Sequence, residues 1–330
     1  MAGTAARREG TGVFELSGRR IFVAGHRGLV GSALLRRLAR EDCVVLTVDR
    51  AALDLRDQAG VEDWFAAHRP DAVIMAAARV GGIAANLSQP ADFLYDNLAI
   101  QTNVMQAAYR CAAQKLVFIG SSCIYPLGAP QPLAESALLK GELEPSHQWY
   151  GTAKIAGMKL AQAYRQQHGC DFITVLPTNL YGPGDNFDPQ TSHVLPALIH
   201  KAHAAKLAGA AELPIWGSGT PRREFLHVDD CADACVHLLQ HYSHAEPVNL
   251  GTGRDISVLE LAQLVCAVIG FQGAIVPQPD KPDGAPRKLL DISRLKATGW
   301  RARIPLREGI AATYRWYLEA HARGEVRAHT

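Results

Sequence analysis

A glycine-rich turn between a strand pattern and a helix pattern restricts the fold of this chain more than any other feature. Residues 20–24 form a short apolar run typical of a buried strand, and residues 32–40 have the spacing of a helix. Between them lie Gly25, Gly28 and Gly31. Glycines at this spacing permit a tight turn, a close approach of pyrophosphate to the backbone, and close packing of the helix on the strand. The pattern therefore predicts a dinucleotide site at a helix N-terminus rather than a plain turn.

The alternation of strands and helices continues through the first half of the chain. Apolar runs at 44–48, 72–78 and 115–119 indicate strands, and 61–68 and 92–111 indicate helices. This order predicts an α/β fold with a doubly wound parallel sheet, a Rossmann fold, which binds ligands at the carboxyl ends of its strands. After residue 184 the alternation breaks, so we expect a smaller, discontinuous substrate domain. The expected boundaries are 1–17 for a flexible tail, 18–180 with 225–250 for the NADP-binding domain, and 181–224 with 251–330 for the substrate domain.

The end of the second predicted strand carries information on the type of cofactor. An acid here binds the ribose 2′-hydroxyl of NAD, whereas an arginine accommodates the 2′-phosphate of NADP. This chain has both, Asp49 and Arg50, and Arg27 adds a cation inside the glycine loop. The two basic residues favour NADP(H), and Asp49 leaves NAD open.

The stretch from residue 120 to residue 154 contains groups suited to proton transfer. Ser121 follows a predicted strand, and Tyr150 and Lys154 are four residues apart, so they share one face of a helix. An ammonium close to a phenol favours phenolate and lowers a pKa that is normally about 10. These residues together indicate ketone–alcohol chemistry. The competing interpretation is a helix with a surface lysine and a half-buried tyrosine.

Composition excludes several classes of protein. The formal net charge of +2 points to neither nucleic acid nor an anionic membrane as a partner. The seven cysteines are scattered without a Cys-x-x-Cys pair, which indicates reduced thiols in a cytoplasmic protein. No metal-binding motif is present, so no metal is expected. No apolar run reaches the roughly 18 residues of a membrane helix.

Several longer strings recur in one known family, namely 25–28, 78–83, 120–126, 177–183, 192–194, 216–221, 223–230 and 281–284. They resemble the GDP-L-fucose synthase branch of the extended short-chain dehydrogenase/reductase family. The resemblance covers nearly the whole chain after residue 18. It implies NADPH-dependent epimerisation of GDP-4-keto-6-deoxy-D-mannose at C3 and C5, reduction at C4 to GDP-L-fucose, and a homodimer formed through helices at 92–111 and 150–168.

The resemblance also implies a role for each reacting group. Cys123 corresponds to the base that removes the sugar protons, and His193 to the acid that returns them. Tyr150 protonates the alkoxide with help from Ser121, and Lys154 keeps the tyrosine acidic and holds the nicotinamide ribose. Taken singly, Cys123 fits a buried small residue and His193 a loop histidine, but the surrounding strings favour the catalytic roles.

The remaining predicted contacts belong to the cofactor and the nucleotide sugar. Arg222 and Arg287 fit either a pyrophosphate clamp or ordinary surface charge, and His200 and His203 are expected on a helix surface. The predicted cofactor residues are Gly25, His26, Arg27, Gly28, Leu29, Val30, Gly31, Asp49, Arg50, Asp54, Ala77, Tyr150, Lys154, Pro177, Asn179, Leu180 and His193. The substrate residues implied by the resemblance are Asn179, Lys201, Trp216, Arg223 and Lys288.

Two alternatives stay open at this point. The first is a relative that acts on another GDP-4-keto sugar, such as a GDP-L-colitose synthase, or a pure epimerase that retains NAD. The second is a non-catalytic dinucleotide-binding protein of the same fold, which would be expected to lack the Tyr150 and Lys154 pair.

Overall fold

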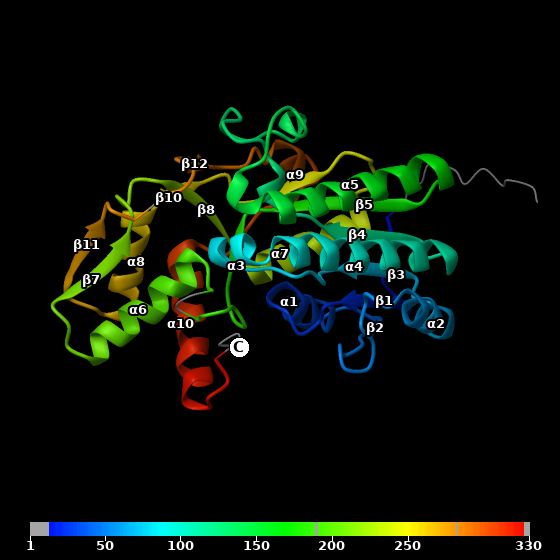
Figure 1. Ribbon diagram of the computed structural model, residues 1–330. Helices are drawn as coiled ribbons and strands as arrows, with labels where there is room; N and C mark the ends of the chain where they lie inside the picture. The colour runs from blue at the N-terminus through cyan, green and yellow to red at the C-terminus, as the bar shows by residue number, and fades with distance from the viewer. Residues whose placement is uncertain (1–12, 189–190, 282, 327–330) are drawn as a thin grey trace, which may run out of the picture.

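The computed structural model describes residues 13–188, 191–281 and 283–326, and Figure 1 shows their arrangement. Within these ranges, six parallel strands form the main sheet in the order β2-β1-β3-β4-β5-β9. This confirms the predicted Rossmann fold. The strands are β1 (Arg19–Ala24), β2 (Cys43–Leu46), β3 (Ala72–Met75), β4 (Lys115–Ile119), β5 (Asp171–Pro177) and β9 (Val248–Leu250).

Helices cover the main sheet on both faces. Right-handed crossovers place α1 (Leu29–Leu38) with α7 (Val228–His241) on one face. The other face carries α2 (Gln58–His68), α4 (Pro90–Arg110) and α5 (Gln148–His168), which pack side by side (Figure 1). β3 and β4 are buried along their whole length, as expected for central strands covered twice.

The strand order reverses direction between β1 and β3, which is where such sheets bind ligands. Gly25 has a φ of 82°, and a Cβ there would lie 2.7 Å from the backbone of Ala77 after β3. A Cβ on Gly31 would lie 2.0 Å from the Gly25 carbonyl oxygen. Both positions therefore require glycine, one for the turn and one for the approach of α1 to it.

A second hydrophobic core lies around α6 (Val194–Leu207), α8 (Val258–Ile269) and α10 (Leu306–Ala322). Ser257 is the N-cap of α8 and forms a capping box with Glu260. The strands here are β6 (Asn179–Tyr181), β8 (Arg222–His227), β10 (Asp255–Ser257) and β12 (Arg287–Lys288) in one sheet, and β7 (Glu212–Trp216) with β11 (Ala274–Gln278) in another. The short helices are α3 (Ile83–Ser88) and α9 (Ser293–Ala297), with 3₁₀ turns η1 (Ser122–Ile124), η2 (Glu135–Ala137) and η3 (Pro145–His147).

The structure corrects two predicted segment assignments. Leu16 is 3% exposed within the main core, and the Phe14 amide donates to the Gln240 carbonyl at 2.9 Å. The predicted flexible tail is therefore wrong for residues 13–17, while residues 1–12 lie outside the described residues. Pro282 of the 281–284 string also lies outside them. Leu290, Leu295 and Trp300 also belong to the main core, although the sequence assigned them to the substrate domain.

The predicted surface position of two histidines is also wrong. His203 is 8% exposed, and its Nδ1 lies 3.0 Å from the Tyr314 hydroxyl. Nδ1 of His200 lies 3.0 Å from the Tyr317 hydroxyl. Both histidines are on α6 and face α10. The spacing of residues in α6 cannot show that this face packs against a helix more than 100 residues away along the chain. Across the described ranges, none of the helices is both long and apolar enough to cross a membrane.

A fully buried carboxylate joins the two regions of the fold. Glu224 on β8 accepts backbone N–H groups from Thr252 at 2.6 Å, Gly253 at 2.6 Å and Leu290 at 2.9 Å. A Cβ on Gly251 would lie 2.3 Å from a Glu224 carboxylate oxygen, so this segment approaches β8 too closely for a side chain. The carboxylate therefore satisfies donors that would otherwise be buried without partners.

We expect Glu224→Gln to lower the free energy of unfolding by about 1–3 kcal/mol, because an amide nitrogen cannot accept a hydrogen bond and leaves a buried donor unsatisfied. Urea denaturation measures the effect, with Glu212→Gln on the exposed part of β7 as the matched control. Equal stabilities of the two variants would show that the Glu224 contacts do not hold this junction together.

Candidate active site

The reacting groups predicted from the sequence lie together at the carboxyl end of β4. Ser121 caps η1, and its hydroxyl oxygen accepts the backbone N–H of Cys123 at 3.1 Å. The Ser121 side chain is also close enough to Tyr150 on α5 to lower its pKa. The Cys123 thiol is close enough to Tyr150 to influence its ionisation. One short turn and one helix thus bring a serine, a thiol and a phenol to the same edge of the sheet.

Lys154 is buried behind Tyr150. The side chain is 4% exposed, its Nζ donates to the Ile119 carbonyl at 2.8 Å, and it lies 5.7 Å from the centre of the Tyr150 ring. Burial lowers the pKa of Lys154 to about 7, because the surrounding protein disfavours the ammonium. The Ile119 carbonyl therefore holds the amine in place beside the tyrosine.

The predicted decrease in the pKa of Tyr150 is wrong. Burial raises the pKa of this phenol, the nearby Cys123 raises it further, and the hydrogen bond with Ser121 acts in the opposite direction. The lysine does not reverse the effect because burial also disfavours its own charge. The phenol is consequently protonated at neutral pH, which is the form that a proton donor needs.

Lys288 approaches the thiol from the second half of the chain. Its Nζ lies 3.9 Å from the Cys123 Sγ. Lys288 on β12 is also the Cα partner of Arg223 on β8, so the two predicted substrate cations lie side by side on parallel strands. The four-stranded sheet of β6, β8, β10 and β12 therefore places a cation beside the predicted base, which the sequence did not indicate.

Two histidines complete this region. His193 begins α6, and its side chain is exposed to solvent although the protein around it lowers its pKa through desolvation. Burial lowers the pKa of His147 to about 4, and the charges of Lys288 and His193 contribute to this decrease. These effects place His147 near both residues, three positions before Tyr150. His147 was not among the residues predicted from the sequence, and its position just before the Tyr150 helix is a signal that could have indicated it.

The glycine loop fits a dinucleotide. Gly28 precedes α1 without any side-chain hydrogen bond to the helix N-terminus in the described structure, so the first N–H groups of α1 are available to a phosphate. Ala77, which follows β3, contacts this loop. Pro177 is the last residue of β5, and Leu180 is the middle residue of β6. Leu29, Val30 and Gly31 form the first turn of α1, as their predicted contact with the cofactor requires.

Asp49, the acid that follows β2, forms ion pairs with its basic neighbours. Nε and one terminal nitrogen of Arg27 each lie 2.8 Å from an Asp49 oxygen, and His26 Nε2 lies 3.2 Å from the carboxylate. Arg50 is 78% exposed, and its Nε is 4.0 Å from Asp54. Because cations cover Asp49 and Arg50 extends into solvent, this end of the site suits a 2′-phosphate.

The predicted substrate residues come from the four-stranded sheet, from β7 and from α6. The Asn179 side-chain amide donates to the Glu224 carbonyl at 2.8 Å, and Lys201 Nζ lies 5.5 Å from the centre of the Trp216 ring. Trp216 is 62% exposed, which leaves its ring available for stacking. Burial lowers the pKa of Arg223, and Asp283 counteracts this effect.

Two arginines with open assignments prove to be structural. Arg222 Nε lies 2.9 Å from Asp255, and Arg287 Nε lies 2.5 Å from the same carboxylate. The mostly buried carboxylate of Asp255 on β10 thus joins β8 and β12 through two ion pairs with half-exposed arginines. In the part of the chain that the structure describes, no three His, Cys, Asp or Glu side chains are grouped as a metal site requires.

Comparison with known proteins agrees with this site. The family described as "NAD dependent epimerase/dehydratase family" matches residues 21–251. The chain is 55% identical to a GDP-L-fucose synthase of Sinorhizobium fredii over 93% of this chain and 98% of the relative, and 49% identical to that of Escherichia coli over 92% and 98%. A GDP-L-fucose synthetase of Naegleria fowleri bound to NADP superimposes with a TM-score of 0.89 at 29% identity, covering 97% of this chain and 99% of that one. The chain therefore belongs to the NAD dependent epimerase/dehydratase family, in the group of the GDP-L-fucose synthases.

Proposed function

We propose that this chain is an NADPH-dependent epimerase and reductase that converts GDP-4-keto-6-deoxy-D-mannose to GDP-L-fucose. The observation that carries the proposal is the grouping of Cys123, Ser121 and Tyr150 at one strand end, with Lys288 3.9 Å from the thiol. A plain dehydrogenase needs the serine, tyrosine and lysine but has no use for a thiol two residues after the serine. The relatives named GDP-L-fucose synthase support the same substrate.

Epimerisation requires proton transfer on carbon. The C4 ketone of the sugar acidifies the protons on C3 and C5, and the Cys123 thiolate removes them. Ser121 and Tyr150 donate hydrogen bonds to the resulting enolate oxygen. His193 returns a proton to the opposite face of the carbon, and its solvent-exposed position allows it to be reprotonated.

Reduction uses the same oxygen donors. Bound NADPH supplies the hydride that reaches C4. Tyr150, whose phenol is protonated at neutral pH and whose pKa burial raises further, gives its proton to the alkoxide that forms there. Lys154 lies behind the tyrosine with a pKa of about 7, so at neutral pH it can hold a proton and pass it to the phenolate that the transfer leaves.

The nucleotide is held by the second half of the chain. Arg223 and Lys288 lie on adjacent strands as cations for the diphosphate, and Trp216 with Lys201 offers a ring and a charge beside it. Asn179 is fixed by the Glu224 carbonyl next to these residues. We assign these contacts to the substrate domain, whose core is separate from that of the Rossmann domain.

A homodimer formed through α4 and α5 is part of this proposal. The two helices pack together, yet Tyr95 on α4 is 67% exposed and Trp149 on α5 is 41% exposed. Large apolar side chains at such positions suit an interface with a second copy. Sedimentation velocity measures the mass of the assembly.

We place the enzyme in the cytoplasm because its seven cysteines are free thiols, including Cys231 and Cys235, which are buried in the core.

We expect Cys123→Ser to slow deuterium uptake from D₂O at C3 and C5 by about 10²-fold or more, because a hydroxyl is a far weaker base than a thiolate. NMR of the sugar measures the uptake. Cys43→Ser, at the start of β2, is the matched control and should exchange at the wild-type rate. Unchanged exchange in Cys123→Ser would remove this thiol from the role of base. The stereochemistry of the sugar in the wild-type product distinguishes GDP-L-fucose from a related GDP-sugar.

We expect the Lys154→Met substitution to have a more favourable effect on the free energy of unfolding near pH 7 than near pH 10, with the wild type as the reference at each pH. In the wild type the folded pKa of about 7 lies below the ordinary value of 10.5, so the unfolded chain binds the extra proton between these values. Wild-type stability therefore rises with pH across this window, and the methionine variant lacks this dependence. Urea denaturation at both pH values tests the difference, with exposed Lys159→Met on α5 as control. A stability difference that is independent of pH would mean that Lys154 is charged in the folded protein.

A further inference from the structure

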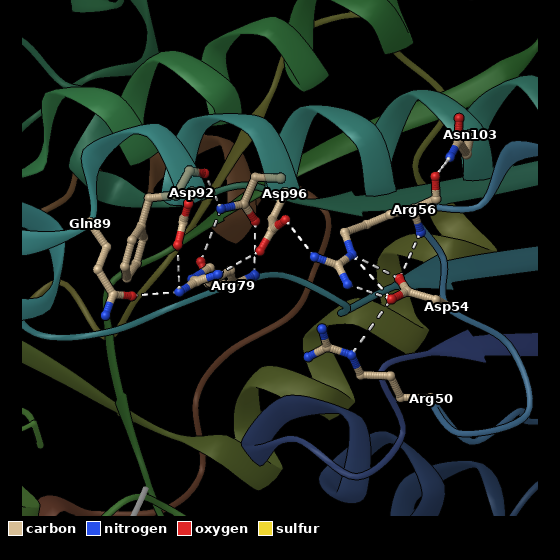
Figure 2. A network of polar contacts seen from close by, with 10 residues as sticks. Arg50, Asp54, Arg56, Arg79, Gln89, Asp92, Asp96 and Asn103 are labelled. Atoms are coloured by element: carbon tan, nitrogen blue, oxygen red, sulfur yellow. Dashed lines mark hydrogen bonds and ion pairs between the residues drawn. The ribbon is translucent and has the colours of Figure 1, made fainter. Parts of the chain in front are cut away.

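A chain of alternating charges runs from the predicted 2′-phosphate site to α4 (Figure 2). Arg50 follows β2, and Asp54 and Arg56 lie in the crossover that leads to α2. The chain continues through Asp96 on α4 to Arg79, which follows β3. Its members are half-buried or exposed except Asp96, which is 6% exposed.

Arg56 binds the Asp54 carboxylate with most of its donors. Its Nε lies 3.0 and 3.1 Å from the two oxygens, and a terminal nitrogen lies 2.6 Å from one of them. This side-chain hydrogen bond is the main reason that the pKa of Asp54 is lowered to about 2. By contrast, Arg50 approaches the same carboxylate only to 4.0 Å, beyond hydrogen-bond range.

The surroundings prevent Arg56 from leaving Asp54. A second terminal nitrogen of Arg56 lies 2.9 Å from Asp96 Oδ1, and Arg79 holds the other Asp96 oxygen at 2.7 Å. The Asn103 side-chain amide donates to the carbonyl of Arg56 at 3.0 Å and so fixes the backbone as well. Figure 2 shows these contacts converging on α4. The guanidinium of Arg56 is therefore held between two carboxylates.

We propose that Arg56 is a positioning residue that sets the preference for NADP over NAD. It occupies the Asp54 carboxylate, so the guanidinium of Arg50 remains available for the 2′-phosphate. Without Arg56, Asp54 would form a full ion pair with Arg50 and would also place an unbalanced negative charge beside the phosphate. Both effects act on the phosphate and not on the 2′-hydroxyl of NAD. The inference depends on the NADPH part of the proposed function and on no property of the sugar.

Binding of NADP⁺ and NAD⁺, measured by isothermal titration calorimetry without sugar, tests the proposal. We expect Arg56→Met to weaken NADP⁺ about fivefold, the effect of losing one exposed ion pair, and to leave NAD⁺ within about twofold. Arg56→Lys keeps the positive charge and should retain most of the preference. Arg110→Met, which removes an α4–α2 ion pair with Glu62 far from this network, is the matched control and should alter neither affinity.

A double variant separates the proposed effect from general damage to the fold. Asp54→Asn in the Arg56→Met background removes the charge that would capture Arg50, so NADP⁺ affinity should return to within about twofold of the wild type. Equal losses for NADP⁺ and NAD⁺ in Arg56→Met, or no recovery in the double variant, would overturn the proposal. Because no sugar is present, the result does not depend on whether the product is GDP-L-fucose.

Discussion

The buried carboxylate of Glu224 is the contact on which the arrangement of the active site most depends. It joins β8 to the segment after β9 and to the chain after β12 through backbone N–H groups. β8 carries Arg223, and the strands paired with it carry Asn179 and Lys288. Since one side chain holds these segments together, the substrate residues keep a fixed position relative to the main sheet.

Burial controls protonation throughout the site. It keeps the Tyr150 phenol protonated, lowers the pKa of Lys154 to about 7 and lowers that of His147 to about 4. Lys154 thus comes close to exchanging protons at the pH of the cell, whereas the phenol stays protonated. His147 stays neutral, where a second cation would repel Lys288. The shift at Lys154 lowers the stability of the fold near neutral pH, because burial disfavours the ammonium.

Local patterns predicted those elements whose signal is contained in their own residues. The strand at 115–119 and the glycine loop both occur where the sequence placed them. Leu16, His203 and Trp300 were misassigned, because each is buried by residues distant in sequence and not by neighbours on its own segment. The resemblance, rather than spacing, pointed to Cys123 and His193, since a single thiol or imidazole has no characteristic spacing.

The sequence by itself determined the parallel sheet, the cradle for a dinucleotide and the types of reacting group, because glycine spacing and apolar periodicity act over a few residues. Only the tertiary structure decided how charges distant in sequence meet. It placed Lys288 beside Cys123 and placed Arg56 between Asp54 and Asp96. It also reversed the expected effect on Tyr150, since burial depends on the whole fold and outweighs the lysine four residues away.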